Sequence, residues 1–570
     1  MNKIKLRYYF PGGFLLGVLR GLTETARLHS SYPLNTDLFS LSIQIVLLYG
    51  LGIGFLGLIP ASVLRLVLKN KNITRLLLPI AWLSALIGID IWGFLTPIPE
   101  TCRCSYRMPP QFSAGDNASD VLIFTLDTCR ADYLGAYGND FVRTPTLDRI
   151  ARTGATVIDA IAPIPITTSS HATIFTGQDP PEHGSRFNAV PIKTESTTMA
   201  EIFRNHGYKT GAFVSAFPVV HEVSGLARGF DVYDQLLTPS HLHPLIHRST
   251  ILRGFTRFGP FRPAERKWFR TIPPVFKWWS QNFEQPLFTW VHFYDPHFPY
   301  EPGFPFDKMY LSRPPRFKQN VFDIAEINRT SATPDLEMID EFKRLYAGEI
   351  SAVDHAVELL IRELYHQNRL LKTSIIVTAD HGESLDEHGY YFAHGSNLHD
   401  PSIRVPLILS FPDQLAPNRV VPRQIRLASL AQIVYTLLNL PGSPKSPSAL
   451  VEVSENGSLI IADENYAFCE TGSGVYIAAH QPSRESIQRK HRAVRSSDRK
   501  VIFVPEDKQY RYNLSIDPSE SQFSPTDQVF TVMTQVLTDY VQESEARTSF
   551  ELVLPDEHVL QQLKLLGYME

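Results

Sequence analysis

The 570-residue sequence predicts an α/β protein built on a mostly parallel sheet flanked by helices, preceded by an apolar N-terminal region. Continuous apolar runs such as Val121–Leu126 and Ser374–Thr378 are typical of strands that are buried on both faces. Segments with helical periodicity separate these runs. Strands that alternate with helices form parallel sheets, whose ligands bind at the carboxyl ends of the strands.

The composition excludes several classes of protein. Apolar residues make up 44% of the chain and charged residues 20%, as in a globular protein rather than a disordered one. The formal net charge of −4 lacks the basic excess of a nucleic-acid-binding protein, so we expect no nucleic-acid partner. The four cysteines are too few for a disulfide scaffold, and none lies in a Cys-x-x-Cys zinc spacing.

Residues 1–97 are expected to cross a membrane. The apolar runs within Leu38–Leu68 and Ile73–Leu95 are each long enough to span a bilayer. Gly12–Leu28 is a weaker third candidate, for which an interfacial amphipathic helix is the alternative. Basic residues precede the first candidate and separate the two strong ones: Lys3, Lys5, Arg7, Lys69, Lys71 and Arg75. Three spans would place all of them in the cytoplasm, which predicts an extracytoplasmic catalytic domain on a multi-pass membrane protein.

The rest of the chain divides into four parts. Residues 98–118 are expected to be a linker, and residues 119–450 a catalytic domain of alternating strands and helices. Strand patterns within 492–504 and 510–514 predict a small sheet in a subdomain over 451–520, and a helical tail follows over 521–570. Residues 232–285 are expected to be irregular, and a lid or membrane-facing insertion is favoured over a nucleic-acid surface.

Acidic and imidazole side chains follow two of the predicted strands. Asp127 comes directly after Val121–Leu126, and Asp380 and His381 come shortly after Ser374–Thr378. Because the carboxyl ends of parallel strands meet at one edge of a sheet, we expect these side chains to converge. Together with a hydroxyl group, they make an oxygen and nitrogen donor set suited to a divalent cation.

The hydroxyl in this set is expected to come from Thr167, which opens a run of small hydroxyl residues after several prolines. Ser and Thr are favoured at helix starts, so this run predicts a short helix. A hydroxyl there faces the positive end of the helix dipole, where an alkoxide forms more easily. An ordinary capped helix is the alternative for an isolated run, but the acidic stretches at neighbouring strand ends favour a nucleophile.

These segments resemble, in order, motifs of sulfatases and their relatives in the alkaline phosphatase superfamily. The resemblance extends from Val121 to Glu520. The motifs are Asp127-Thr-Cys-Arg-Ala-Asp132, Thr167-x-x-x-His171-x-x-x-x-Thr-Gly, Pro296-His297-Phe-Pro299, Asp380-His381-Gly-Glu383, Arg404-Val-Pro-Leu, Tyr512-Asn-Leu and the terminal Leu565-Leu-Gly-Tyr568. The resemblance implies an alkaline phosphatase-like α/β core with a small C-terminal sheet, and a nucleophile that lies on the metal.

The resemblance also suggests roles for residues near the nucleophile. His297 and His394 are candidates to contact substrate oxygens or to protonate the leaving group. His171 is expected either to hold the nucleophile helix or to contact the substrate. Arg130 is expected either to contact an anion or to pair with a buried acid.

The resemblance bears on the metal as well. His292 and Asp295 could help to build a second metal site, as in two-metal relatives, but their spacing differs from those relatives and favours one metal. Calcium-using sulfatases often have an amide oxygen at the last ligand position, where this chain has His381. An imidazole nitrogen shifts the preference toward Mn²⁺ or Zn²⁺, with Ca²⁺ or Mg²⁺ as alternatives.

The nucleophile motif departs from that of true sulfatases. Thr167 stands where they have a Cys or Ser that becomes formylglycine within Cys/Ser-x-Pro-x-Arg, and His171 stands at the Arg position. Hydrated formylglycine expels sulfate by collapsing to an aldehyde, an exit that a threonine ester lacks. A phosphoryl group on threonine can instead be cleaved by attack at phosphorus.

We therefore expect a hydrolase or transferase of anionic esters, such as those of glycans or lipid headgroups. Phosphate or phosphonate esters are favoured over sulfate esters. The alternative is a catalytically inactive binding or structural domain with the same fold.

Overall fold

A computed structural model describes residues 119–237, 265–440 apart from 413, and 451–547 with gaps at 455–456, 458, 462–464, 473–489 and 506–507. The expected membrane spans and linker (1–118) lie outside these residues, as do 238–264 of the insertion and 548–570 of the tail. None of the helices in the described ranges is long and apolar enough to cross a bilayer.

The core is an eight-stranded sheet in the order β4-β3-β5-β1-β6-β7-β2-β8. Its strands are β1 (Asp120–Leu126), β2 (Ala155–Ile161), β3 (Lys209–Phe213), β4 (Val232–Asp234), β5 (Leu287–Phe293), β6 (Thr373–Thr378), β7 (Arg404–Ser410) and β8 (Arg419–Arg426). β7 runs antiparallel to both of its neighbours, and the other pairs are parallel. The prediction of a mostly parallel sheet is confirmed.

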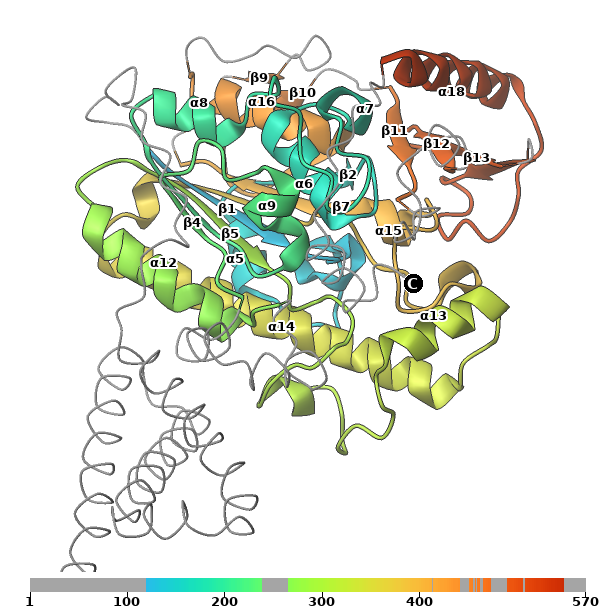
Figure 1. Ribbon diagram of the computed structural model, residues 1–570, viewed down its shortest axis with the longest axis horizontal. Helices are drawn as coiled ribbons and strands as arrows, with labels where there is room; N and C mark the ends of the chain where they lie inside the picture. Colours follow the sequence, from blue (N-terminus) through green and yellow to red (C-terminus); the bar gives the residue numbers. More distant parts are fainter. Residues whose placement is uncertain are drawn as a thin grey trace, which may run out of the picture. The chain divides into compact units, whose positions relative to one another are not determined.

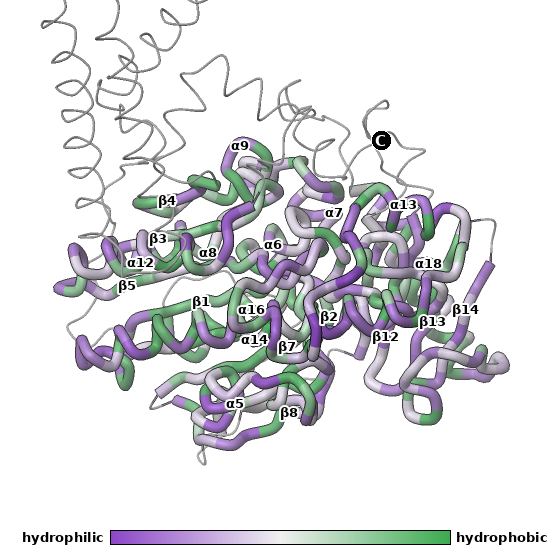
Figure 2. Tube along the Cα trace, turned by 90° about the horizontal axis from the view of Figure 1, so that it is seen from below, coloured by the Kyte–Doolittle hydropathy of each residue, from purple (hydrophilic) through white to green (hydrophobic). Residues whose placement is uncertain are grey.

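Two layers of helices cover the sheet (Figure 1). One layer holds α5 (Pro145–Arg152), α12 (Trp268–Asn282) and α14 (Leu336–His366), and the other holds α6 (Thr167–Thr176), α8 (Met199–Asn205) and α16 (Leu430–Leu437). Consecutive side chains of β5 point to opposite faces of the sheet. Phe288 stacks on Phe203 of α8, and the Trp279 indole of α12 donates a hydrogen bond to the Thr289 hydroxyl. Hydrophilic residues recur along α12 and α14, as expected for helices with one buried face (Figure 2).

The C-terminal part forms a separate four-stranded antiparallel sheet, as predicted. Its strands are β11 (Ala467–Glu470), β12 (Arg492–Arg495), β13 (Arg499–Val504) and β14 (Lys508–Asn513). Helix α18 (Gln528–Arg547) packs on this sheet through Phe530, Met533 and Leu537. Shorter elements are β9 (Val451–Val453) paired with β10 (Leu459–Ile461), and α7 (Pro180–His183), α9 (His221–Ser224), α13 (Val321–Thr330) and α15 (Asp400–Ile403).

The prediction that residues 232–285 are irregular is wrong for two segments. β4 extends the sheet, and α12 is a 15-residue helix although it contains Pro273 and Pro274. These prolines remove two backbone donors. Burial of one face of α12 offsets that cost: a Cβ at Gly211 of β3 would lie 2.9 Å from the Trp278 ring, so this close packing requires glycine.

Candidate active site

The four expected metal-binding side chains lie in one region of the structure. Asp127 follows β1, and Asp380 and His381 follow β6, which pairs with β1 in parallel. One potential ligand atom from each of these three residues lies within 4.8 Å of the others. Thr167 is the first residue of α6 and, like the other three, is fully buried.

One polar atom of each of these side chains is buried without a hydrogen-bond partner: Asp127 Oδ1, Thr167 Oγ1, Asp380 Oδ2 and His381 Nε2. Buried polar atoms are normally paired. Asp380 Oδ1, by contrast, accepts from the backbone N–H groups of His381 (2.9 Å) and Thr128 (3.3 Å). The unpaired set of three oxygens and one nitrogen fits a divalent cation.

The tautomer of His381 agrees with this interpretation. Its Nδ1 lies 2.9 Å from the carbonyl oxygen of Gly382. A carbonyl oxygen can only accept, so Nδ1 carries the proton and donates it there. Nε2 of the neutral ring therefore has a lone pair, and it lies 3.4 Å from Asp380 Oδ2 and 3.9 Å from Asp127 Oδ1.

The two carboxylates are electrostatically unfavourable on their own. Burial, with a smaller effect of Glu383, raises the pKa of Asp127 to about 7, although His381 and the nearby Thr167 hydroxyl oppose the shift. Burial and the proximity of Asp127 also raise the pKa of Asp380. A bound cation would favour the ionised form of both groups.

His171 contacts the first residue of α6, as the first of its two expected roles requires. Its Nδ1 lies 2.8 Å from the carbonyl oxygen of Thr167 and 3.4 Å from Asp380 Oδ2, and its Nε2 lies 3.0 Å from Thr125 Oγ1. Both ring nitrogens are thus occupied inside the protein. Burial lowers the pKa of His171 to about 3, so the imidazole is neutral.

Arg130 forms the ion pairs expected as the second of its two alternatives. Its guanidinium donates to both carboxylate oxygens of Asp132 (2.9 and 2.7 Å) and to Glu387 Oε1 (2.6 Å). A further bond goes to the carbonyl oxygen of Glu383 (3.2 Å). These bonds tie Arg130 to the loop that follows β6.

His297 and His394 lie beside the candidate cation-binding set, by which we mean the side chains of Asp127, Thr167, Asp380 and His381. The His394 ring centroid is 4.4 Å from that of His381 and 5.0 Å from that of His297. His394 Nδ1 lies 3.1 Å from Glu383 Oε1, and His297 Nδ1 lies 2.6 Å from the carbonyl oxygen of Phe298. Burial lowers the pKa of both rings, that of His394 to about 4.

The sequence analysis assigns no role to two further residues of the site. Glu383 contacts His394, and its place in the Asp380-His381-Gly-Glu motif is the sequence feature that could indicate a role. Asn188 Oδ1 accepts a hydrogen bond from the Thr168 backbone N–H (3.0 Å) at the start of α6. No local pattern in the sequence marks Asn188, because its partner lies 20 residues away.

His292 and Asp295 do not form a second metal site with each other. His292 Nε2 lies 3.3 Å from Asp127 Oδ2, whereas Asp295 Oδ1 accepts from the Trp268 backbone N–H (2.9 Å). Asp295 belongs to a different buried group with Lys267 and Glu349, which neighbour it electrostatically. Neither His292 nor Asp295 is part of a potential metal-binding group of three or more residues in the described part of the chain.

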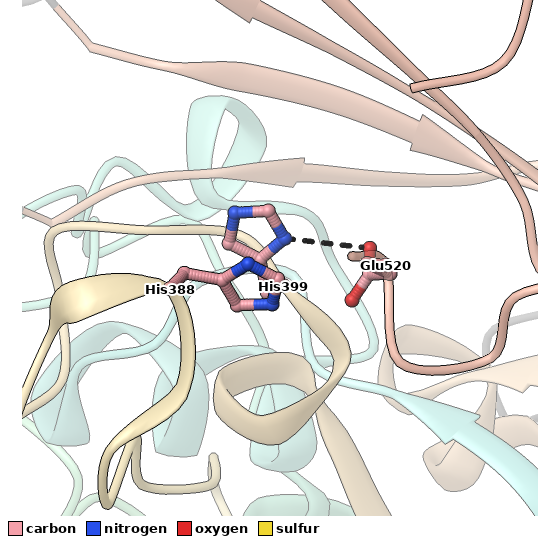
Figure 3. A group of neighbouring side chains, drawn as sticks. All are labelled: His388, His399 and Glu520. Atoms are coloured by element: carbon pink, nitrogen blue, oxygen red, sulfur yellow. Dashed lines mark ion pairs between the residues drawn. The ribbon is translucent and has the colours of Figure 1, made fainter. Parts of the chain in front are cut away.

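One other histidine cluster brings potential ligands together, His388, His399 and Glu520 (Figure 3). The two imidazole rings are stacked with centroids 3.5 Å apart and 12° between their planes. Ring nitrogens in stacked planes do not point toward one cation. Glu520 Oε1 lies 3.6 Å from His399 Nδ1 and is already paired with Lys500 Nζ at 2.6 Å. We interpret this cluster as a contact between the loop after β6 and the C-terminal sheet.

Comparisons with known proteins agree with this architecture. Residues 119–443, more than half of the chain, match the sulfatase family. An ulvan-active sulfatase from Formosa agariphila is 23% identical over 321 residues, which are 55% of this chain but only 60% of that protein. A multifunctional alkaline phosphatase superfamily protein from Trinickia caryophylli is 22% identical over 371 residues, or 51% of this chain and 68% of that one.

Solved structures share the fold. A phosphonate monoester hydrolase from Agrobacterium radiobacter aligns with a TM-score of 0.59 and 21% identity, covering 76% of this chain and 96% of that one. A phosphonate monoester hydrolase from Silicibacter pomeroyi gives a TM-score of 0.57 and 18% identity, with the same coverage. The matched family, the ordered motifs and the shared fold lead to one conclusion: the chain belongs to the sulfatase family.

Proposed function

We propose that this sulfatase-family chain is a membrane-anchored, metal-dependent hydrolase or transferase of phosphorus esters, with Thr167 as its nucleophile. The observation that carries the proposal is the Thr167 hydroxyl, which is buried and unpaired at the first position of α6. It belongs to the same set of unpaired atoms as the carboxylates of Asp127 and Asp380 and the imidazole of His381.

The chain itself prepares Thr167 for attack. His171 binds the Thr167 carbonyl oxygen, and Asn188 binds the next backbone N–H, so the first turn of α6 is held from two sides. The positive end of the helix dipole favours an alkoxide at this position. A divalent cation held by Asp127, Asp380, His381 and Thr167 would supply further stabilisation of the alkoxide.

His394 is placed to handle protons of the alcohol that leaves or enters. We propose that Nδ1–H of His394 donates to Glu383 Oε1, the tautomer that leaves a lone pair on Nε2 of the neutral ring. A low pKa keeps this ring neutral, so it can accept a proton from water or an acceptor alcohol during transfer from the threonine ester. His297, beside it, is proposed to contact the substrate.

The charge of the site supports a monoanionic ester. In the described ranges, the basic side chains within 4 Å of the carboxylates of Asp127 and Asp380 are imidazoles, not Arg or Lys. Burial raises the pKa of Glu383 to about 8, so at neutral pH one divalent cation would balance the carboxylates of Asp127 and Asp380 and leave no surplus positive charge. A dianionic phosphate monoester would therefore be less well compensated than a phosphodiester or a phosphonate monoester.

Thr167 supports phosphorus over sulfur, because a threonine sulfate ester has no aldehyde-forming exit. The phosphonate monoester hydrolases that share the fold are consistent with phosphorus chemistry. The ulvan-active sulfatase among the relatives keeps sulfate esters of glycans as the competing substrate class.

The test compares Thr167→Ala with Thr167→Ser on phosphodiester, phosphonate and aryl sulfate substrates. Thr167→Ala should lose turnover, and Thr167→Ser, which keeps the hydroxyl, should retain much of it. Mass spectrometry of quenched wild-type reactions should locate a phosphoryl adduct on Thr167. Aryl sulfate turnover far above phosphodiester turnover would refute the substrate class. A metal-free wild-type protein with no turnover of any ester would support the inactive-domain alternative.

The proposed metal is Mn²⁺ or Zn²⁺, since an imidazole replaces an oxygen ligand. Chelator-stripped protein should regain activity with Mn²⁺ or Zn²⁺ and less with Mg²⁺ or Ca²⁺. Full activity with Ca²⁺ alone would contradict this choice.

The proposed location rests on the apolar runs and basic clusters of residues 1–97. With three spans, protease added outside intact cells or spheroplasts should digest the catalytic domain. Protection of residues 120–520 until lysis would overturn the extracytoplasmic placement.

A further inference from the structure

His292 and Ser215 form a hydrogen-bonded pair behind Asp127. His292 lies on β5, and Ser215 follows β3, which pairs with β5 in parallel. Both residues are fully buried. The His292 ring also packs edge-on against the His171 ring, with centroids 5.0 Å apart. His292 contacts Asp127 and His171 contacts Asp380, so each imidazole lies against one carboxylate of the cation-binding set.

The contacts of Ser215 determine which nitrogen of His292 carries the proton. The Ser215 backbone N–H donates to His292 Nδ1 (3.3 Å). The Ser215 hydroxyl lies 2.6 Å from the His292 carbonyl oxygen and 3.0 Å from His292 Nδ1, and it can share its proton between these two acceptors. The backbone N–H at Nδ1 can only donate, and an ionised Asp127 carboxylate at Nε2 can only accept, so we assign Nδ1 as the acceptor and the proton to Nε2.

The protonated nitrogen faces Asp127. His292 Nε2 lies 3.3 Å from Asp127 Oδ2, so its N–H can donate to that oxygen and fix the orientation of the carboxylate. Asp127 Oδ1 is the oxygen that remains unpaired in the cation-binding set. Groups that hydrogen-bond to a metal ligand fix its orientation and strengthen metal binding, typically by 10–100-fold.

We propose that His292, held in its Nε2–H tautomer by Ser215, is a positioning residue that orients Asp127 toward a single divalent cation. The inference rests on the cation ligation proposed above, but on neither the nucleophile nor the substrate. It replaces the idea of His292 as a ligand of a second metal with a role in the hydrogen-bond shell of the first.

The test measures Mn²⁺ binding to the chelator-stripped full chain by titration with electron paramagnetic resonance, which needs no turnover. His292→Asn and His292→Gln form a matched pair. The Asn amide ends near the position of Nδ1 and cannot reach Asp127, whereas the Gln amide can place an N–H near the position of Nε2. His292→Asn should weaken Mn²⁺ binding about 10–100-fold, and His292→Gln only a few-fold.

A control separates positioning from stability. His183 is another fully buried histidine, bonded to Thr173 Oγ1 at 3.0 Å, and it contacts none of the four proposed ligands. His183→Asn should lower the melting temperature as His292→Asn does, yet leave Mn²⁺ affinity unchanged. Ser215→Ala, which keeps the backbone N–H, should have a smaller effect on Mn²⁺ affinity than His292→Asn.

The outcomes are distinguishable. Unchanged Mn²⁺ affinity in folded His292→Asn overturns the positioning role while leaving the proposed function intact. Two bound Mn²⁺ in the wild type, with one lost in both His292 variants, makes His292 a ligand and also overturns it. A wild type that binds no Mn²⁺ or Zn²⁺ overturns this inference together with the metal-dependent function.

Discussion

Two groups of acidic residues in this protein are largely shielded from solvent and differ in what surrounds them. In the candidate active site, at the carboxyl ends of β1 and β6 (hereafter the catalytic edge), Asp127 and Asp380 face imidazoles and a hydroxyl. Burial raises the pKa of both carboxyls. At the junction with the C-terminal sheet, Asp400 accepts two hydrogen bonds from Arg495 (3.0 and 2.9 Å) and pairs with Lys500. Burial opposes it, but Arg495 and Lys500 hold the pKa of Asp400 well below its usual range.

The difference shows how a binding site is told from a structural ion pair. A buried carboxylate is stable only when an opposite charge or several donors compensate for lost hydration. The chain supplies that charge at the junction from its own Arg and Lys. At the catalytic edge it leaves Asp127 Oδ1 and Asp380 Oδ2 unpaired, which suits a cation from solution.

The largest expected effect lies at the catalytic edge. Asp380→Ala or His381→Ala should remove the cation and lower kcat/KM by about 10³-fold or more, since a bound cation contributes several kcal/mol to the reaction. Metal analysis and circular dichroism of the same samples would show loss of metal without unfolding. Asp400→Asn is the matched control and should keep the metal in its folded fraction. Equal metal content in all three variants would contradict the comparison.

The second expected effect is on folding stability, where substitution of Asp400 should cost more than substitution of Asp380. Asp400→Asn should lower the free energy of unfolding by about 1.5–3 kcal/mol, because it weakens the charged hydrogen bonds of Arg495 and Lys500. Asp159 and Glu520 remain as partners of these two side chains. Asp380→Asn in metal-free protein should cost much less, because in the described part of the chain its carboxylate pairs with imidazoles and not with Arg or Lys. Denaturant titration of both variants measures the difference. Similar losses would show that the two groups are equivalent.

The third prediction concerns pH in metal-free protein. The pKa of Asp127 is raised from 3.8 to about 7 in the folded state, so the folded chain retains a proton that the unfolded chain releases. The contribution of Asp127 to stability is therefore greatest below pH 4 and falls as pH rises toward 7. Asp127→Asn cannot ionise, so its stability relative to the wild type should increase through this window by about 1.4 kcal/mol per pH unit. Saturating Mn²⁺ should abolish the advantage of the variant, and an advantage independent of pH would argue against the shift.

The smallest effect is expected at the start of α6. Asn188→Ala removes the acceptor for the Thr168 N–H and should cost about 1 kcal/mol of stability, with a modest fall in kcat from a less ordered Thr167. Asn188→Asp keeps the acceptor and adds a charge that suits a helix start, so it should retain stability. Thermal melting and steady-state kinetics would compare the two. A larger loss in Asn188→Asp than in Asn188→Ala would show that the amide donor matters instead.

Much of the fold could be predicted from the sequence because its signals are local. Helical periodicity in the sequence predicts one helix over Pro145–Arg152 and a long one over roughly Asp335–Gln367. The structure has α5 over Pro145–Arg152 and α14 over Leu336–His366. Asp127 and Asp380 could be named as candidate ligands because each lies one or two positions beyond an apolar strand. An apolar run and the residues that follow it are adjacent in the chain, so no tertiary information is needed to connect them.

The roles of the surrounding side chains depended on tertiary packing. The sequence alone leaves His171 and Arg130 with two possible functions each, and it suggests His292 only as a ligand of a second metal. Partners that are remote in sequence bear on these roles. His292 lies 165 residues from Asp127, and Arg130 lies 257 residues from Glu387. Whether a histidine binds a cation, holds a helix or orients a carboxylate depends on which atoms its two nitrogens meet. Residue type and spacing determine that a cation-binding edge can form in this chain, and the hydrogen bonds across the sheet decide which side chains face the cation and which stand behind them.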